Sequence, residues 1–172
     1  MANVNLFQSI AGYRVYLASM LQLYDRFEES LSWSAGAAKV TDLVGRLKGC
    51  LRDDLEALDV DDVVSDAAQQ FDSNESKWAT SYVMEGASMG AKYVLRSIEE
   101  KKDRERFPTS YLETLVNESK DRWPKYVAAL DNADCDHELA VDAALHAFDV
   151  AWGVFETNVQ TAGLKPSARN AQ

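Results

Sequence analysis

The chain has 172 residues, close to the usual size of one domain, and its 47% of hydrophobic residues exclude the class of disordered proteins. Its 28 acidic and 18 basic residues give a formal net charge of −10, which argues against nucleic acids and anionic membrane surfaces as partners, because both require a basic footprint. Its two cysteines lack a CxxC spacing and no stretch reaches about 18 apolar residues, so we expect a reduced, cytoplasmic protein that does not enter the membrane.

The first predicted helix covers about residues 6–31, where apolar residues recur at spacings of three and four. This stripe, which we expect to face the core, consists of Ile10, Tyr13, Leu17, Met20, Tyr24, Phe27 and Leu31. Residues 32–36 interrupt the pattern. A second helix is expected over residues 37–47, and a third, short helix through Leu51, Leu55 and Leu58.

In the second half of the chain, apolar residues surround the helix predicted over residues 78–100, which indicates a central, buried element. A charged loop is expected at residues 101–108, followed by a helix over residues 109–130. The last predicted helix, residues 137–160, carries an apolar stripe interpreted as core: Val141, Leu145, Phe148, Trp152, Phe155 and Val159. We therefore expect an all-α, multi-helical bundle, with one domain over residues 1–160 and a flexible polar tail over residues 161–172.

Two glycines four residues apart, Gly86 and Gly90, stand inside the most apolar helix. Each costs about 1 kcal/mol relative to alanine, so the pair calls for a compensating role. Both lie on one helix face, where Ala87 and Ala91 beside them extend a smooth surface. A tight helix crossing or a kink would explain such a surface, and so would a bound planar ligand.

The segment from Tyr82 to Ala91, YVMEGASMGA, resembles the distal-helix signature of bacterial, biliverdin-producing heme oxygenases. Weaker similarity to this family extends over about residues 10–157. The further residues that carry the resemblance are Tyr13, Leu17, Tyr24, Glu28, Arg46, Leu51, Asp54, Leu55, Leu58, Trp123, Tyr126, Leu130, Ala143, Ala144, Phe148 and Trp152.

The resemblance implies a heme-oxygenase-like fold that binds heme and converts it to biliverdin, carbon monoxide and iron. Gly86, Ala87 and Gly90 would then face the heme, and Ser88 would lie near the distal pocket. Tyr82 would donate a hydrogen bond to a heme propionate. Phe148 and Trp152 would line the pocket from the last helix, unless they are core residues like the rest of their stripe.

The family's axial ligand is a histidine on a helix that precedes the segment matched by residues 13–31, and no residue of this chain matches it. The only histidines, His137 and His146, are nine residues apart, on nearly opposite faces of the last helix, and we expect both to be exposed. No catalytic residue is assigned. Three alternatives stay open: the first helix is encoded upstream, the protein binds a tetrapyrrole without an axial histidine, or it is a non-catalytic interaction module. Without that helix an apolar groove would be exposed, which we expect a homodimer to cover.

Two charged features also have two interpretations each. Glu85 would be a buried proton relay or a carboxylate hydrogen-bonded to a neighbouring helix. A basic cluster after the glycines would attract heme propionates or an acidic electron-donor protein, or it would form ordinary surface ion pairs with interleaved acids. This cluster consists of Lys92, Arg96, Lys101, Lys102, Arg104 and Arg106.

Overall fold

The computed structural model describes residues 6–31, 40–60, 63, 71–119 and 122–164, which hold seven α-helices, one short 3-10 helix and no strand. The prediction of an all-α, multi-helical bundle is confirmed. The helices are α1 (Ile10–Arg26), α2 (Glu28–Leu31), α3 (Val40–Glu56), α4 (Asn74–Glu99), α5 (Ser110–Ser119), α6 (Arg122–Leu130) and α7 (His137–Thr161), with the 3-10 helix at Arg104–Arg106.

Side-chain caps fix where the long helices begin. Ser9 accepts a hydrogen bond from the backbone N–H of Gly12 at the start of α1, and Ser73 caps α4 in the same way. Asp136 accepts from two backbone N–H groups at the start of α7. These short polar side chains satisfy donors that have no partner inside the helix, so the sequence sets the first turn of each of these helices locally.

Three predicted helices differ from the observed ones, the first being the helix predicted over residues 6–31, which is divided into α1 and α2. Residues 40–56 form one helix, because Leu47, Leu51 and Leu55 continue a spacing of four and are all buried. Conversely, the single helix predicted over residues 109–130 is divided into α5 and α6. Pro124 explains the division, because proline is tolerated in the first turn of α6 but would clash with a helix that continued from residue 120.

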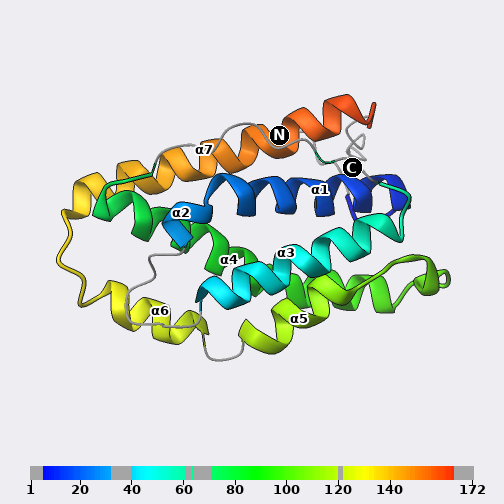
Figure 1. Cartoon of the computed structure of the whole chain (residues 1–172), viewed down its shortest axis with the longest axis horizontal. Helices are drawn as coiled ribbons and strands as arrows, with labels where there is room; N and C mark the ends of the chain where they lie inside the picture. The colour runs from blue at the N-terminus through cyan, green and yellow to red at the C-terminus, as the bar shows by residue number, and fades with distance from the viewer. Residues whose placement is uncertain (1–5, 32–39, 61–62, 64–70, 120–121, 165–172) are drawn as a thin grey trace, which may run out of the picture.

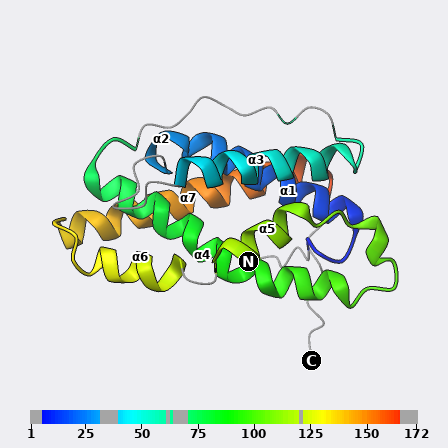
Figure 2. The same cartoon turned by 60° about the horizontal axis from the view of Figure 1, so that its bottom comes forward.

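Helix α4 is the centre of the packing, with α7 and α5 against it. Helix α1 lies between α3 and α7 (Figures 1 and 2). The apolar stripe predicted for α1 is buried, and the hydroxyl of Tyr13 donates to the backbone carbonyl of Pro108 at 2.7 Å. The Asn158 amide of α7 donates to the side-chain oxygens of Ser19 and Gln22 of α1 at 2.9 and 2.8 Å.

A buried carboxylate connects α3 to α5. Asp54 of α3 accepts hydrogen bonds from the backbone N–H groups of Ser110 and Tyr111, at 3.1 and 2.9 Å. Burial nevertheless raises the pKa of the Asp54 carboxyl above its usual value. The carboxylate acts as the cap of α5 across the tertiary structure, and this role is invisible in the local sequence around Ser110.

The last helix ends one residue beyond its predicted end at residue 160. α7 ends at Thr161, where Gly163 adopts a left-handed conformation with φ of +63°, and the N–H of Leu164 bonds to the carbonyl of Val159. This arrangement is a common helix stop, and glycine adopts it without strain. The remainder of the predicted tail, residues 165–172, lies outside the described residues.

Candidate functional site

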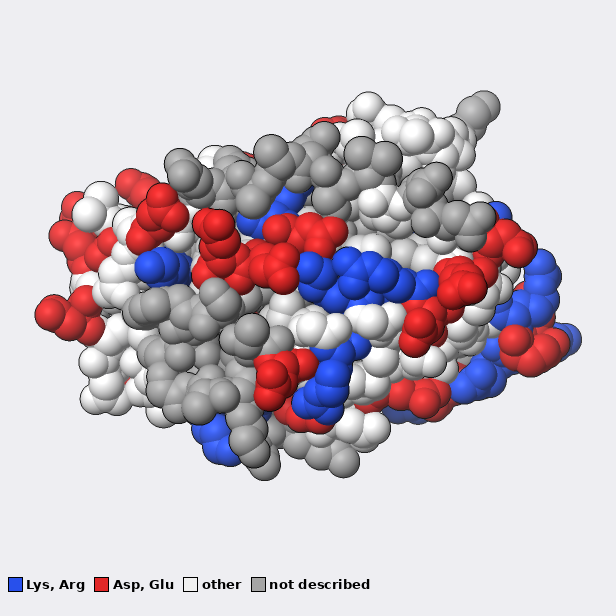
Figure 3. Space-filling view, viewed as in Figure 1, with Lys and Arg blue, Asp and Glu red and all other residues white. Residues whose placement is uncertain are grey.

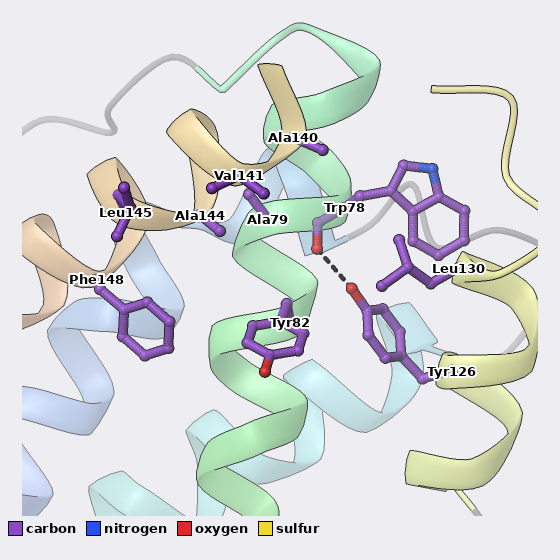
Figure 4. A pocket seen from close by; sticks show the side chains of 10 residues that line it. All are labelled: Trp78, Ala79, Tyr82, Tyr126, Leu130, Ala140, Val141, Ala144, Leu145 and Phe148. Carbon is purple, nitrogen blue, oxygen red and sulfur yellow. Dashed lines mark hydrogen bonds between the residues drawn. The ribbon is translucent and has the colours of Figure 1, made fainter. Parts of the chain in front are cut away.

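An apolar groove of about 310 Å³ opens between α4, α6 and α7 (Figure 4). Aromatic rings from all three helices line it, and α7 adds two alanines beside larger aliphatic side chains. The residues that line it are Trp78, Ala79, Tyr82, Tyr126, Leu130, Ala140, Val141, Ala144, Leu145 and Phe148. Its volume and apolar lining are those of a small ligand-binding site.

Ring contacts fix the aromatic side of the groove. The Tyr82 ring lies 5.6 Å from that of Trp123 and meets Phe148 edge to face at 6.2 Å between centroids. The hydroxyl of Tyr126 donates to the backbone carbonyl of Trp78 at 2.7 Å, so that α6 is held against α4 (Figure 4). Such edge-to-face contacts prefer defined ring orientations, which makes this wall preformed.

The predicted glycines lie on the solvent side of α4. A Cβ atom added to Gly86 or Gly90 would have no atom within 4 Å, so neither glycine is explained by a close helix crossing. Met89 and Tyr93 lie on the same side of α4 and are exposed, Tyr93 to 76%. The prediction that α4 is buried on all sides was wrong. One side of the helix, from Tyr82 onward, is open.

Helix α7 has its large and small apolar residues on unexpected sides. Its core-facing side consists mainly of small residues, with Ala147 and Val154 buried. The predicted core stripe points outward over most of its length: Leu145 is 60% exposed, and Phe148 and Trp152 are each 49% exposed. Phe148 and Trp152 are therefore not core residues. The reason is that alanines let α7 approach α1 and α4 closely, which leaves no room for the large side chains on that side.

We call the exposed apolar residues of these two helices, with the two glycines, the α4/α7 face. It is defined by Tyr82, Gly86, Met89, Gly90 and Tyr93 of α4 and by Val141, Leu145, Phe148 and Trp152 of α7. The large exposed apolar side chains of the described residues all lie on these two helices. Apolar residues grouped in this way are typical of a binding surface rather than of ordinary solvent-facing positions.

Ser88 and Glu85 lie away from the open glycines. Ser88 is buried, and its hydroxyl donates to the backbone carbonyl of Glu85 at 2.6 Å, on the core side of α4. Ala87 is half-buried and packs against the core. The Glu85 carboxylate receives two hydrogen bonds from the Arg122 guanidinium of α6, one from Nε at 3.2 Å and one from Nη2. Of the two interpretations of Glu85, the structure therefore supports a carboxylate that is hydrogen-bonded to a neighbouring helix.

Neither histidine belongs to the groove. His137 and His146 are both exposed, as expected, and neither is among the lining residues. The His146 ring lies 5.6 Å from that of Phe71 instead. The open glycines and aromatic rings fit a flat apolar macrocycle, but the described lining offers no imidazole for an iron atom. Among the described residues, no three His, Cys, Asp or Glu side chains are grouped so that they could hold a metal ion.

Three of the six residues of the basic cluster form surface ion pairs. Arg96 pairs with Glu100 at 3.0 Å, and Arg104 and Arg106 pair with neighbouring acids. At the end of the molecule where α4 leads towards α5, basic and acidic side chains are interleaved (Figure 3). For these three arginines, local pairing accounts for the charge.

Sequence reasoning missed the contribution of α6. Tyr126 and Leu130, which the sequence marked only through the family resemblance, line the groove. Their spacing of four carried the signal for a shared helix face, but only the tertiary structure places that face opposite Trp78.

Comparisons with family models, with curated proteins and with solved structures find no match for this chain. Among the described helices, none is both long and apolar enough to cross a membrane.

Proposed function

We propose that the α4/α7 face binds a tetrapyrrole, with the macrocycle lying flat over Gly86 and Gly90. The observation that carries this proposal is the open space above both glycines beside an aromatic wall. Two interior glycines cost helix stability, and a flat ligand in contact with the backbone is a use that offsets this cost. The proposal agrees with the heme oxygenase resemblance of the segment that contains them.

The ring would be held by apolar and edge contacts. Tyr82 and Phe148 lie at the junction of the groove and the glycine face, and Trp152 extends the apolar surface along α7. The groove, at about 310 Å³, is at the small end of ligand sites, so it would take one edge of the macrocycle while the rest covers the glycines. Ser88 has no part in this proposal because its hydroxyl is directed to the core side of α4.

Binding without cleavage is the form of the function that these residues support best. In the heme oxygenases, which this chain resembles, bound heme supplies the iron at which dioxygen is activated. The described groove residues include no histidine to hold that iron, so we derive no cleavage step and assign no catalytic residue.

A hemin titration of the purified protein tests the proposal. We expect a saturable, shifted Soret band for the wild type. Gly86→Leu should weaken binding at least about tenfold, because the side chain occupies the space meant for the ring. Gly45→Leu is the matched control, since Gly45 also lies in a helix, α3, with open space around its missing Cβ but is remote from the groove. Equal affinity of all three proteins would contradict the proposal.

Adding a reductant under air to the hemin complex then separates binding from cleavage. Persistence of the Soret band is expected for a binding protein. Its decay to a biliverdin-like spectrum would instead establish the enzyme and require an axial ligand other than a histidine of the described groove.

The outward orientation of the large α7 side chains favours a second candidate, a non-catalytic protein-interaction module. If the wild type does not bind hemin saturably, the protein-interaction module becomes the favoured function.

A further inference from the structure

A second pocket, of about 300 Å³, lies between α1, α3 and the residues that follow α3. Helices α1 and α3 lie side by side and run in opposite directions (Figures 1 and 2). The pocket shares no lining residue with the groove between α4, α6 and α7, so the two are separate sites. Its apolar part consists of the buried Leu21 and Leu55 and the half-buried Val60 and Val63.

The charged side chains at the two ends of this pocket are paired. At one end Lys48 of α3 forms ion pairs with Asp25, which lines the pocket, and with Glu28, at 2.7 and 2.9 Å. Beyond the other end, Arg14 of α1 lies 3.9 Å from Asp59. The charges in these positions are therefore compensated within the chain.

Arg52 and Glu56 line the pocket between these pairs, and in the described part of the chain neither forms an ion pair or a hydrogen bond. They are four residues apart on α3, so their exposed side chains lie on one face of the helix. An arginine that precedes a glutamate by four residues is the weaker order for a helical ion pair, which leaves both groups available. The pocket thus presents a free guanidinium and a free carboxylate beside an apolar wall.

We propose that this pocket binds a free amino acid with an aliphatic side chain, in its zwitterionic form. The Arg52 guanidinium donates hydrogen bonds to the carboxylate of the ligand, and the Glu56 carboxylate accepts from its ammonium group. The aliphatic side chain of the ligand covers Leu21 and Leu55. The volume of the pocket is at the lower end for ligand sites, as a small ligand of this kind requires.

The arrangement of charges favours a zwitterion over a simple ion. A simple anion would be attracted by Arg52 but repelled by Glu56 and by the net charge of −10. A simple cation would meet the unpaired guanidinium. Only a ligand that carries both charges close together compensates Arg52 and Glu56 at the same time, and this complementarity supplies the specificity.

Titration calorimetry of the wild type with L-leucine tests the proposal. We expect saturable binding of L-leucine. Two analogues should bind at least about tenfold more weakly: leucinamide, which lacks the carboxylate, and isocaproate, which lacks the ammonium group.

Variants of the two free charges test the assigned residues. Arg52→Gln and Glu56→Gln should each weaken L-leucine binding at least about tenfold, and both should stay folded because the side chains are exposed. Arg46→Gln and Asp53→Asn are the matched controls. They remove an exposed arginine and an exposed acid of α3 that do not line the pocket, so the affinity should be that of the wild type.

Analogues and variants together identify which charge binds which group. Arg52→Gln should bind L-leucine and leucinamide equally, since the partner of the carboxylate is gone. Glu56→Gln should likewise bind L-leucine and isocaproate equally. The inference does not depend on tetrapyrrole binding, and Gly86→Leu should leave the affinity for L-leucine unchanged.

Three results would overturn the proposal. One is a wild type that does not bind L-leucine at concentrations up to about 10 mM. Another is isocaproate or leucinamide binding as tightly as L-leucine, which would show that the site takes a simple ion. The third is binding of L-leucine that Arg52→Gln and Glu56→Gln leave unchanged, or that Gly86→Leu abolishes, since the ligand would then bind elsewhere.

Discussion

Helices α1 and α7 carry apolar stripes of the same periodicity, yet one stripe is buried and the other is largely exposed. Leu17 of α1 is fully buried, whereas Leu145 of α7 is 60% exposed. The two stripes differ in burial because of the residues on the other side of α7. Small residues such as Ala147 let α7 pack closely through its other side, so its stripe is free to point outward. A helical apolar period thus identifies a surface that needs a partner, but does not say whether that partner belongs to the same chain.

The largest expected effect compares matched leucines of the two stripes. Leu17→Ala should lower the free energy of unfolding by about 2 to 5 kcal/mol, because it leaves a cavity in the core. Leu145→Ala should change it by no more than about 0.5 kcal/mol, as for other surface positions. Denaturant unfolding, at concentrations where the chain sediments as a monomer, measures both. Similar losses for the two variants would break the comparison, because they would show that the α7 stripe is also core.

The stability of the protein at alkaline pH tests whether the stripe of α1 is buried, because this stripe contains Tyr24. Burial raises the pKa of the Tyr24 hydroxyl from 10.0 to about 12. Because the folded state holds this proton more tightly, the contribution of Tyr24 to stability is complete below pH 10 and is lost as the pH rises through about 12. Between these values we expect a loss of about 1.4 kcal/mol per pH unit from this group.

Unfolding of wild type and Tyr24→Phe across this pH range measures that loss. The variant lacks the ionisable hydroxyl, so the difference in unfolding free energy between the two proteins should change with pH in favour of the variant. A difference that is constant with pH would show that Tyr24 is not protected from ionisation in the folded protein.

Replacing glycines by alanine should give the smallest changes in the free energy of unfolding. These variants compare a crowded helix face with an open one. Gly86→Ala and Gly90→Ala should each raise the free energy of unfolding by about 1 kcal/mol, because the new methyl group meets no atom and alanine favours the helix. Gly12→Ala in α1 should destabilise the protein instead, since its Cβ would lie 2.5 Å from the backbone oxygen of Leu6.

Thermal or denaturant unfolding of the three glycine variants provides the measurement. If Gly86→Ala and Gly90→Ala also weaken hemin binding, the gain in stability and the loss in binding would together show that these glycines are kept for the ligand rather than for the fold. Destabilisation by both would mean that the space above them is filled in the folded protein.

The sequence by itself determined the helical class, the stripe of α1 and the caps that begin the long helices. These features depend on residue periodicity and on side chains that bond to the backbone within a few residues, such as Ser9 and Ser73. The smooth glycine face of α4 could also be read from the spacing of Gly86 and Gly90.

Only the tertiary structure decided which surfaces are covered. Asp54 caps a helix 56 residues away, and Tyr126 closes a groove against Trp78, through contacts that no local pattern records. The exposure of the α7 stripe likewise depends on which neighbours pack against each side of the helix. Periodicity reports the direction in which a side chain points, whereas burial depends on what the rest of the chain places there.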